Sequence, residues 1–314
     1  MEMLLTNLVE PGDRVVVVVN GFFGGRGAEM ARRLGAEVVE VKAPWGQPID
    51  PAAVEAALAA GKTALLYFVH AETSTGVRND AAALAAAGRR HDALVLMDCV
   101  TSLGGLAVDI DGFGVDAAFS GSQKCLGAPC GLAPITFGPR ALAKIERRQR
   151  PPPSIYFDLL WLEKYWGSEK SYHHTAPIQN FFALEVALQL IHDEGLEQRW
   201  ERHAATHRSL AAGLGAMGFT LLPPAAARLP MLNAVVIPAG LDELALRKRL
   251  LLTHSIEIGA GLGDLKGKIV RVGLMGRNAT RAAVVTFLAA FEESLRAQGH
   301  ATPAGAGVAA AIAG

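Results

Sequence analysis

The sequence predicts an α/β fold with a mostly parallel sheet, followed by a smaller α+β domain. Residues 14–19 form a continuous β-branched run, which is typical of a strand buried on both faces. From there to Ser120, short apolar runs alternate with helical patterns, as in sheets whose parallel strands are joined by helices. Beyond Glu194 and Gly195, long helical patterns with few strands take over. We therefore predict a large domain over 1–194, a small domain over 195–300 and a disordered tail of small residues over 301–314.

The elements of the large domain follow from local signals. A helix is predicted from Pro51 because Asp50 suits the N-cap and proline suits the first helical position. Similar reasoning gives strands at 14–19, 36–41, 63–69, 93–98 and 117–120, and helices at 1–9, 28–34, 51–60, 80–88 and 179–192. Residues 132–137 return too soon for a parallel crossover, so this strand is predicted to run antiparallel. The helix at 1–9 is short and apolar, and we expect it to expose apolar surface.

The second part of the chain alternates long helical patterns with short strands. Apolar residues recur at helical spacing in the last helix, for which Asn278 or Thr280 is the expected N-cap. We predict helices at 196–217, 242–254 and 280–298, and strands at 219–222, 234–238 and 268–274.

Composition excludes several classes of function. The formal net charge is zero and the isoelectric point is about 7.1, which favours neither nucleic acid nor an anionic membrane as a partner. No apolar stretch reaches the length of a membrane span, and the N-terminus lacks the basic flank of a signal peptide. The three cysteines (Cys99, Cys125 and Cys130) lack zinc-type spacing and are expected to be thiols in a cytoplasmic protein.

Two neighbouring strands are predicted to end in groups of opposite charge. The strand 93–98 ends in Asp98, and Lys124 follows shortly after the strand 117–120. Ligands of open α/β sheets bind at the carboxyl ends of the strands, where a lysine with a lowered pKa can form a Schiff base with a carbonyl. The alternatives are a surface lysine and a loop or capping aspartate.

Six segments in chain order resemble the class V pyridoxal-phosphate aminotransferases, and within them the alanine–glyoxylate and serine–glyoxylate (serine–pyruvate) group. These segments are Asn20–Gly24, Glu72–Val77, Asp98–Gly105, Ser120–Lys124, Tyr172–Thr175 and Ile269–Leu274. The resemblance runs from about Leu4 to Arg296. It implies the pyridoxal-phosphate transferase fold (fold type I), pyridoxal 5'-phosphate as cofactor and a homodimer. It also implies that the N-terminal segment of the family, with its Ser/Gly-rich phosphate loop, is lacking here.

The resemblance implies a role for each matching residue. Lys124 would form the Schiff base with the cofactor and shuttle the substrate α-proton, and Asp98 would hold the pyridine nitrogen protonated. Arg271 would grip the substrate carboxylate with its guanidinium fork, although an exposed arginine on an edge strand is the alternative. The remaining cofactor contacts would be Phe23 and Val100 on the ring faces, Thr73 at the phenolic oxygen, Gln123 at the phosphate, and Tyr172 and Thr175 reaching the partner's phosphate.

The sequence thus predicts an aminotransferase that moves an amino group from alanine or serine to glyoxylate or pyruvate. Another enzyme with the same cofactor, such as a 2-aminoethylphosphonate transaminase or a desulfurase, is an alternative, although desulfurases carry histidine where Gln123 stands. A dinucleotide-binding module or a non-catalytic binding protein is the alternative from another class, because glycines follow the strand 14–19, though not in GxGxxG spacing. His173 and His174 point apart in an extended chain, and no third ligand is evident, so no metal is expected.

Overall fold

The computed structural model describes residues 1–313, and its centre is a six-stranded sheet in the order β2-β1-β3-β6-β7-β8. The strands are β1 (Arg14–Val19), β2 (Glu37–Lys42), β3 (Leu65–Val69), β6 (Leu94–Asp98), β7 (Ala117–Phe119) and β8 (Ile135–Phe137). Neighbouring strands are parallel except for β7 and β8, which pair antiparallel. The predicted α/β class and the reversed direction of the last strand are both confirmed.

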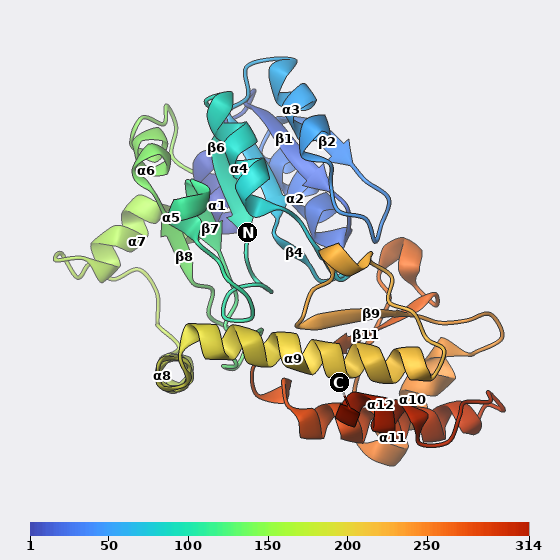
Figure 1. Cartoon of the computed structure of the whole chain (residues 1–314). Helices are drawn as coiled ribbons and strands as arrows, with labels where there is room; N and C mark the ends of the chain where they lie inside the picture. The colour runs from blue at the N-terminus through green and yellow to red at the C-terminus, as the bar shows by residue number, and fades with distance from the viewer. Residues whose placement is uncertain (314) are drawn as a thin grey trace.

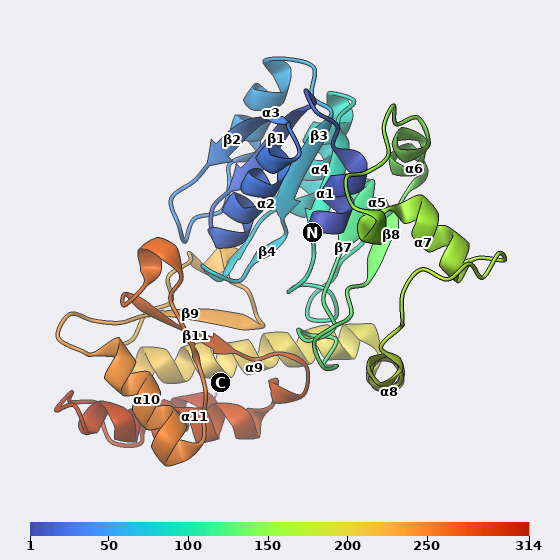
Figure 2. The ribbon, with the colours of Figure 1, turned by 180° about the vertical axis from the view of Figure 1, so that it is seen from behind.

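Helices cover both faces of this sheet (Figures 1 and 2). On one face lie α1 (Glu2–Leu8), α2 (Phe22–Arg33) and α6 (Pro139–Glu146), and on the other α3 (Pro51–Ala59), α4 (Ala81–Arg90) and α5 (Ile110–Phe113). Val15 and Val17 pack into the core under α1 and α2, whereas Val16 and Val18 pack into the core under α3 and α4. Because successive side chains of a strand point to opposite faces and both faces are covered, β1 is apolar at every position from Val15 to Val19.

Helix α1 corrects one expectation. Its apolar side chains were expected to be exposed, but Leu4, Leu5 and Leu8 are fully buried in the core that α2 and the sheet share. The side chain of Asn7 also donates a hydrogen bond to the carbonyl of Phe157, at 2.6 Å. The cover therefore comes from segments far along the chain, which the local pattern of residues 1–9 does not reveal.

The C-terminal part forms a second, three-stranded sheet in the order β10-β11-β9 (Figure 1). Its elements are α9 (Leu196–Ala216), β9 (Leu232–Val236), α10 (Glu243–His254), β10 (Gly259–Ala260), β11 (Ile269–Gly273) and α11 (Arg281–Arg296). The strand predicted at 219–222 is wrong, because this segment makes only an isolated bridge between Leu221 and Val235. Helix α11 begins as predicted, with the Thr280 side chain accepting a hydrogen bond from the Ala283 amide.

Two long helices, α8 and α9, connect the main sheet with the C-terminal sheet. Helix α7 (Leu159–Trp166) precedes α8 (Ile178–Glu194), and α8 gives way to α9 at Gly195. The small hairpin of β4 (Ala71–Glu72) and β5 (Val77–Arg78) lies on the side of the main sheet that faces β9 (Figure 1). The division into domains at residues 194 and 195 falls at the junction of α8 and α9 and stays a prediction.

The tail 301–314 was expected to be disordered, but it contains α12 (Ala306–Ala313), which packs along α9. Its contact is close because both helices present glycine: a Cβ on Gly213 would lie 2.7 Å from the carbonyl oxygen of Gly307. Ala311 is buried at the same contact. Small residues here serve close helix packing, and their composition alone does not distinguish this use from disorder.

Candidate active site

A cavity of about 300 Å³ lies at the carboxyl ends of β3, β6 and β7. Most of the residues predicted to contact the cofactor line this cavity: Phe23, Thr73, Asp98, Val100, Gln123 and Lys124. They come from α2 and from the loops that follow three parallel strands, so the sheet brings together side chains that are up to 101 positions apart in sequence. Asp98 and Lys124 were predicted to lie at one site, and both of them line this cavity.

Asp98 is a buried carboxylate at the end of β6. Its Oδ1 accepts a hydrogen bond from the Val100 amide at 2.9 Å, and the Tyr67 hydroxyl lies 3.5 Å from Oδ2. Burial raises the pKa of Asp98 to about 7, which the hydrogen bond from Val100 counteracts only in part. No lysine, arginine or histidine of residues 1–313 forms an ion pair with it. A buried carboxylate of this kind gains most from a cationic partner placed in the cavity.

Lys124 is half-buried and also lines this cavity. Burial lowers the pKa of its ammonium group, and the positive charge of Arg271 lowers it further, whereas Cys125 and Asp98 act in the other direction. A lowered pKa leaves more of the amine unprotonated near neutral pH, and the unprotonated amine is the nucleophile and the base.

Arg271 lies in a second hollow of about 480 Å³, which Gln123 and Lys124 also line. Its Nε donates to the carbonyl of Ala260 at 2.7 Å, and its Nη1 donates to the carbonyl of Thr73 at 3.1 Å. The Ala260 carbonyl belongs to β10 and the Thr73 carbonyl to the turn between β4 and β5. These two backbone carbonyls fix the orientation of the guanidinium plane. The flanking Val270 and Val272 are buried in the core, so the side chain of Arg271 points away from that core and into the hollow.

Tyr172 and Thr175 lie outside both cavities. They sit on the exposed segment between α7 and α8, where the Tyr172 hydroxyl is 3.1 Å from Oγ1 of Thr175. In the same segment, the Nδ1 atoms of His173 and His174 are 2.9 Å apart, so the expectation that these two side chains point apart is wrong. Within residues 1–313, no three His, Cys, Asp or Glu side chains are grouped so that they could hold a metal ion.

Sequence reasoning missed the function of Glu72 in building the site. Helix α2 begins at Phe22 and not at the predicted Ala28, because the Glu72 carboxylate accepts hydrogen bonds from the amides of Phe23 (3.1 Å) and Gly24 (3.2 Å). This cap places Phe23 in the first turn, at the cavity. It also occupies the helix N-terminus where a dinucleotide pyrophosphate would bind, which argues against the dinucleotide alternative. No local signal marks Glu72, since its partners lie 48 and 49 residues away.

The residues present fit pyridoxal 5'-phosphate. The cavity offers an unpaired buried carboxylate for the cationic ring nitrogen, an amine for the aldehyde and an aromatic side chain, Phe23, for the ring face. The fit follows from the donor set alone, because a ring with one cationic nitrogen satisfies the otherwise costly ionised form of Asp98.

Comparison with known proteins agrees with this fit. The family model described as aminotransferase class-V matches residues 1–285. The alanine–glyoxylate aminotransferase from Nostoc sp. is 44% identical, with a TM-score of 0.92 over 94% of this chain and 78% of its own. The ureidoglycine–glyoxylate aminotransferase from Bacillus subtilis is 38% identical, with a TM-score of 0.97 over 99% of this chain and 81% of its own. The alanine–glyoxylate aminotransferase of Callithrix jacchus is 38% identical over 94% of this chain and 72% of its own length.

Three features define a pyridoxal-phosphate-dependent enzyme of fold type I. They are the mostly parallel sheet with helices on both faces, the lysine and the carboxylate at its strand ends, and these structural neighbours. Within that class, the chain belongs to the class V aminotransferase family, and it is a transaminase that uses pyridoxal 5'-phosphate.

Proposed function

We propose that this transaminase moves an amino group from alanine or serine to glyoxylate or pyruvate. The observation that carries the proposal is the position of Lys124, which lines both the cavity of Asp98 and the adjoining hollow of Arg271. One amine can thus reach a ring bound beside Asp98 and an amino acid whose carboxylate is bound by Arg271. The relatives named above support glyoxylate as the acceptor, because each of them is named for it.

In this proposal five side chains bind different parts of the cofactor. Asp98 binds the ring nitrogen, while Phe23 and Val100 pack on the two ring faces. Thr73 binds near the phenolic oxygen, and Gln123 binds the phosphate. Pyridoxal phosphate supplies an electron-withdrawing ring that stabilises the carbanion formed at the substrate α-carbon.

Lys124 and Arg271 act on the substrate. Arg271 binds the carboxylate and so orients the α-carbon toward Lys124, while the two carbonyls that hold the guanidinium keep its direction fixed. Lys124 Nζ, as a free amine, would take the proton from the α-carbon as a general base. Its lowered pKa increases the share of the basic form at neutral pH.

The test is an assay of the purified protein with pyridoxal phosphate, glyoxylate and one amino donor at a time: alanine, serine or (S)-ureidoglycine. We expect glycine to form together with the oxo acid of the preferred donor. A preference for ureidoglycine would change the proposed donor but not the acceptor. It would match the donor and acceptor for which the Bacillus subtilis relative is named. If no donor yields glycine while the protein binds the cofactor, the proposed reaction is wrong.

Replacing Arg271 by lysine is expected to raise the KM of the amino donor by roughly 10–100-fold, because a point charge replaces a bidentate fork. Steady-state kinetics with alanine measure this effect. The control is a primary amine that lacks the carboxylate, whose reaction with the same variant should change little. Equal losses for the two substrates would contradict carboxylate binding by Arg271.

We also propose that the chain forms a homodimer through the surface around α8. Four apolar residues spaced four apart on α8 are more than half exposed: Ile178 (52%), Phe182 (62%), Val186 (60%) and Leu190 (51%). Exposing such an apolar stripe to water is energetically unfavourable for a monomer, and stripes of this kind are typical of protein–protein interfaces. The exposed Tyr172 and Thr175 precede it directly, as expected if they contact the partner's cofactor phosphate.

Changing Phe182 to glutamate is expected to weaken dimerisation by roughly 30-fold or more, because it places a charge in the centre of the apolar stripe. Sedimentation velocity over a range of protein concentrations measures the change. Leu252→Glu on α10 is the matched control, since Leu252 is also apolar and is 81% exposed. A monomeric wild-type chain would overturn the dimer proposal, whatever the variants do.

The location is proposed to be the cytoplasm, with no nucleic acid or membrane as a partner. The absence of net charge supports this, as does the burial of Cys99 and Cys125 as thiols. None of the helices in the described residues 1–313 is long and apolar enough to cross a membrane.

A further inference from the structure

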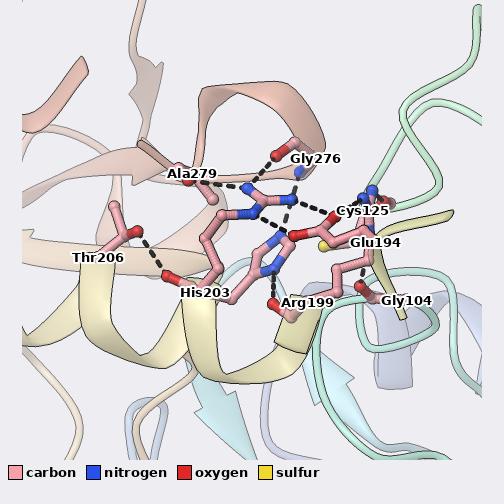
Figure 3. A network of polar contacts seen from close by, with 9 residues as sticks. Gly104, Cys125, Glu194, Arg199, His203, Thr206, Gly276 and Ala279 are labelled. Atoms are coloured by element: carbon pink, nitrogen blue, oxygen red, sulfur yellow. Dashed lines mark hydrogen bonds and ion pairs between the residues drawn. The ribbon is translucent and has the colours of Figure 1, made fainter. Parts of the chain in front are cut away.

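Four polar side chains at the junction of α8 and α9 form a cluster with no place in the predicted site: Glu194, Arg199, Arg202 and His203 (Figure 3). Arg199 is 94% buried and His203 is fully buried. Glu194 accepts hydrogen bonds from both arginines. These bonds lower the pKa of Glu194 to about 2, and the bond from Arg202 has the larger effect. We refer to these four residues as the α9 cluster.

One side of the α9 cluster holds the loop of Lys124. Arg199 donates from Nη2 to the carbonyl of Cys125 at 2.6 Å and from Nε to the carbonyl of Gly104 at 3.1 Å. The Cys125 carbonyl belongs to the residue that directly follows Lys124. Because both bonds come from one planar guanidinium, they fix the direction of the loop as well as its distance.

The other side of the cluster holds the loop that follows Arg271. Arg202 donates from Nη1 to the carbonyls of Gly276 (2.9 Å) and Ala279 (2.8 Å). His203 accepts a hydrogen bond from the Gly276 amide at Nε2, 3.2 Å away, and donates from Nδ1 to the Arg199 carbonyl at 2.8 Å. His203 makes both contacts only when neutral, and burial lowers its pKa accordingly.

The two loops also touch each other beside the cluster. Gly276 has a φ of +57°, and a Cβ there would lie 3.3 Å from the Cα of Gly127 and 3.6 Å from the Cys125 carbonyl oxygen. The loop of Lys124 and the loop that follows β11 therefore pack backbone to backbone at Gly276, where the left-handed conformation favours glycine. Any shift of the cluster moves one loop against the other.

We propose that Arg199, Arg202 and Glu194 are positioning residues of the transaminase, which set the span between the Lys124 amine and the Arg271 guanidinium. The inference rests on the proposed function, because it assumes that these two groups act on one substrate. Lys124 lies on the loop that follows β7 of the main sheet, and Arg271 lies on β11 of the second sheet, just before the loop that the cluster binds. A displacement of about 1 Å between catalytic groups can cost roughly 100-fold in rate. The cluster is the polar contact that bonds to both loops at once.

The first test is a double-mutant cycle that combines Arg202→Lys with Arg271→Lys. Arg202→Lys alone should raise the donor KM by roughly 10-fold or more, since lysine cannot hold Glu194 and two carbonyls together. In the Arg271→Lys background the same change should have less than about a 3-fold effect, because the residue that it positions is already altered. Arg140→Lys is the matched control: Arg140 is 31% exposed against 30% for Arg202, and it pairs with a buried aspartate, Asp116.

The second test measures amide hydrogen exchange of the cofactor-free protein and needs no activity. Arg202→Lys should speed exchange in residues 275–280 and in 125–128, whereas Arg140→Lys should leave both segments unchanged. If Arg202→Lys does not fold, Glu194→Gln carries the same expectations. Unchanged exchange, or additive kinetic effects in the cycle, would overturn the positioning role. A wild-type protein without transaminase activity would instead overturn the proposed function, even if the exchange results held.

Discussion

Replacing Lys124 by alanine is expected to reduce transamination by at least about 10⁴-fold, because it removes the nucleophile and the general base together. The loss should appear in kcat with any amino donor, since Lys124 lines the cavity of the ring and the hollow of the substrate. Lys62→Ala, which removes an exposed lysine, is the control and should retain activity. Mass spectrometry after borohydride reduction should find the cofactor attached to Lys124 in the wild type.

Chemical rescue makes the assignment sharper. A small primary amine added to Lys124→Ala can enter the space that the side chain leaves and restore part of the proton transfer. Rescue that rises with the concentration of free amine would support Lys124 as the base at the substrate α-carbon. A Lys124→Ala variant with wild-type turnover would remove the residue from the mechanism altogether.

The sheet could be predicted from the sequence because its central strands, β1, β3, β6 and β7, are buried on both faces. Residues 15–19 and 93–97 are continuous apolar runs, which no helix or exposed strand of this length would need. The same regularity predicts that Asp98 and Lys124 lie at the same end of the sheet, because the carboxyl ends of parallel strands lie together. Local pattern and tertiary structure agree here, so the prediction succeeds.

The errors arise where distant segments decide a local structure. Helix α2 begins at Phe22 because Glu72 caps it, helix α1 is covered by segments that include Phe157, and α12 is held by close packing on α9. In each case the stabilising contact spans 48 residues or more. The glycines of residues 21–27 and the small residues of 301–313 suggest loops when considered alone, because they favour no single conformation without their partners.

The α9 cluster was not predictable for the same reason. Its arginines lie on a helix whose polar residues resemble an ordinary solvated face, and their acceptors are carbonyls, which carry no sequence signal. The bonds of Arg199 to Gly104 and Cys125 span 95 and 74 residues. Motifs around Lys124 and Arg271 reveal the reacting groups, whereas the side chains that align those groups emerge only from the folded chain.

Replacing Asp98 by asparagine is expected to have opposite effects on activity and on stability. Activity should fall by roughly 10²–10³-fold, because the amide cannot hold the ring nitrogen in its cationic form. The free energy of unfolding of the cofactor-free protein should rise at pH 8. Asparagine keeps the size of the side chain and can still accept from the Val100 amide, but it brings no charge into the buried site.

The pH dependence follows from the sign of the shift. Burial raises the pKa of Asp98 from 3.8 to about 7, so between these values the folded state binds more protons than the unfolded state and stability falls as pH rises. Below pH 4 both states are protonated and the two proteins should differ little. Above pH 7 the full cost of the buried charge, up to about 4 kcal/mol, separates them.

Urea unfolding of the wild type and Asp98→Asn at pH 4, 6 and 8 measures this divergence, with Asp116→Asn as the control. Asp116 is also buried, but Arg89 and Arg140 pair with it, so its replacement should destabilise the protein at pH 8. Saturating pyridoxal phosphate should reverse the order for Asp98, because the bound ring supplies the missing cation to the wild type alone. An Asp98→Asn variant less stable than the wild type at pH 8 without cofactor would mean that the carboxylate already has a cationic partner, and the ring nitrogen would then have to be held by another group.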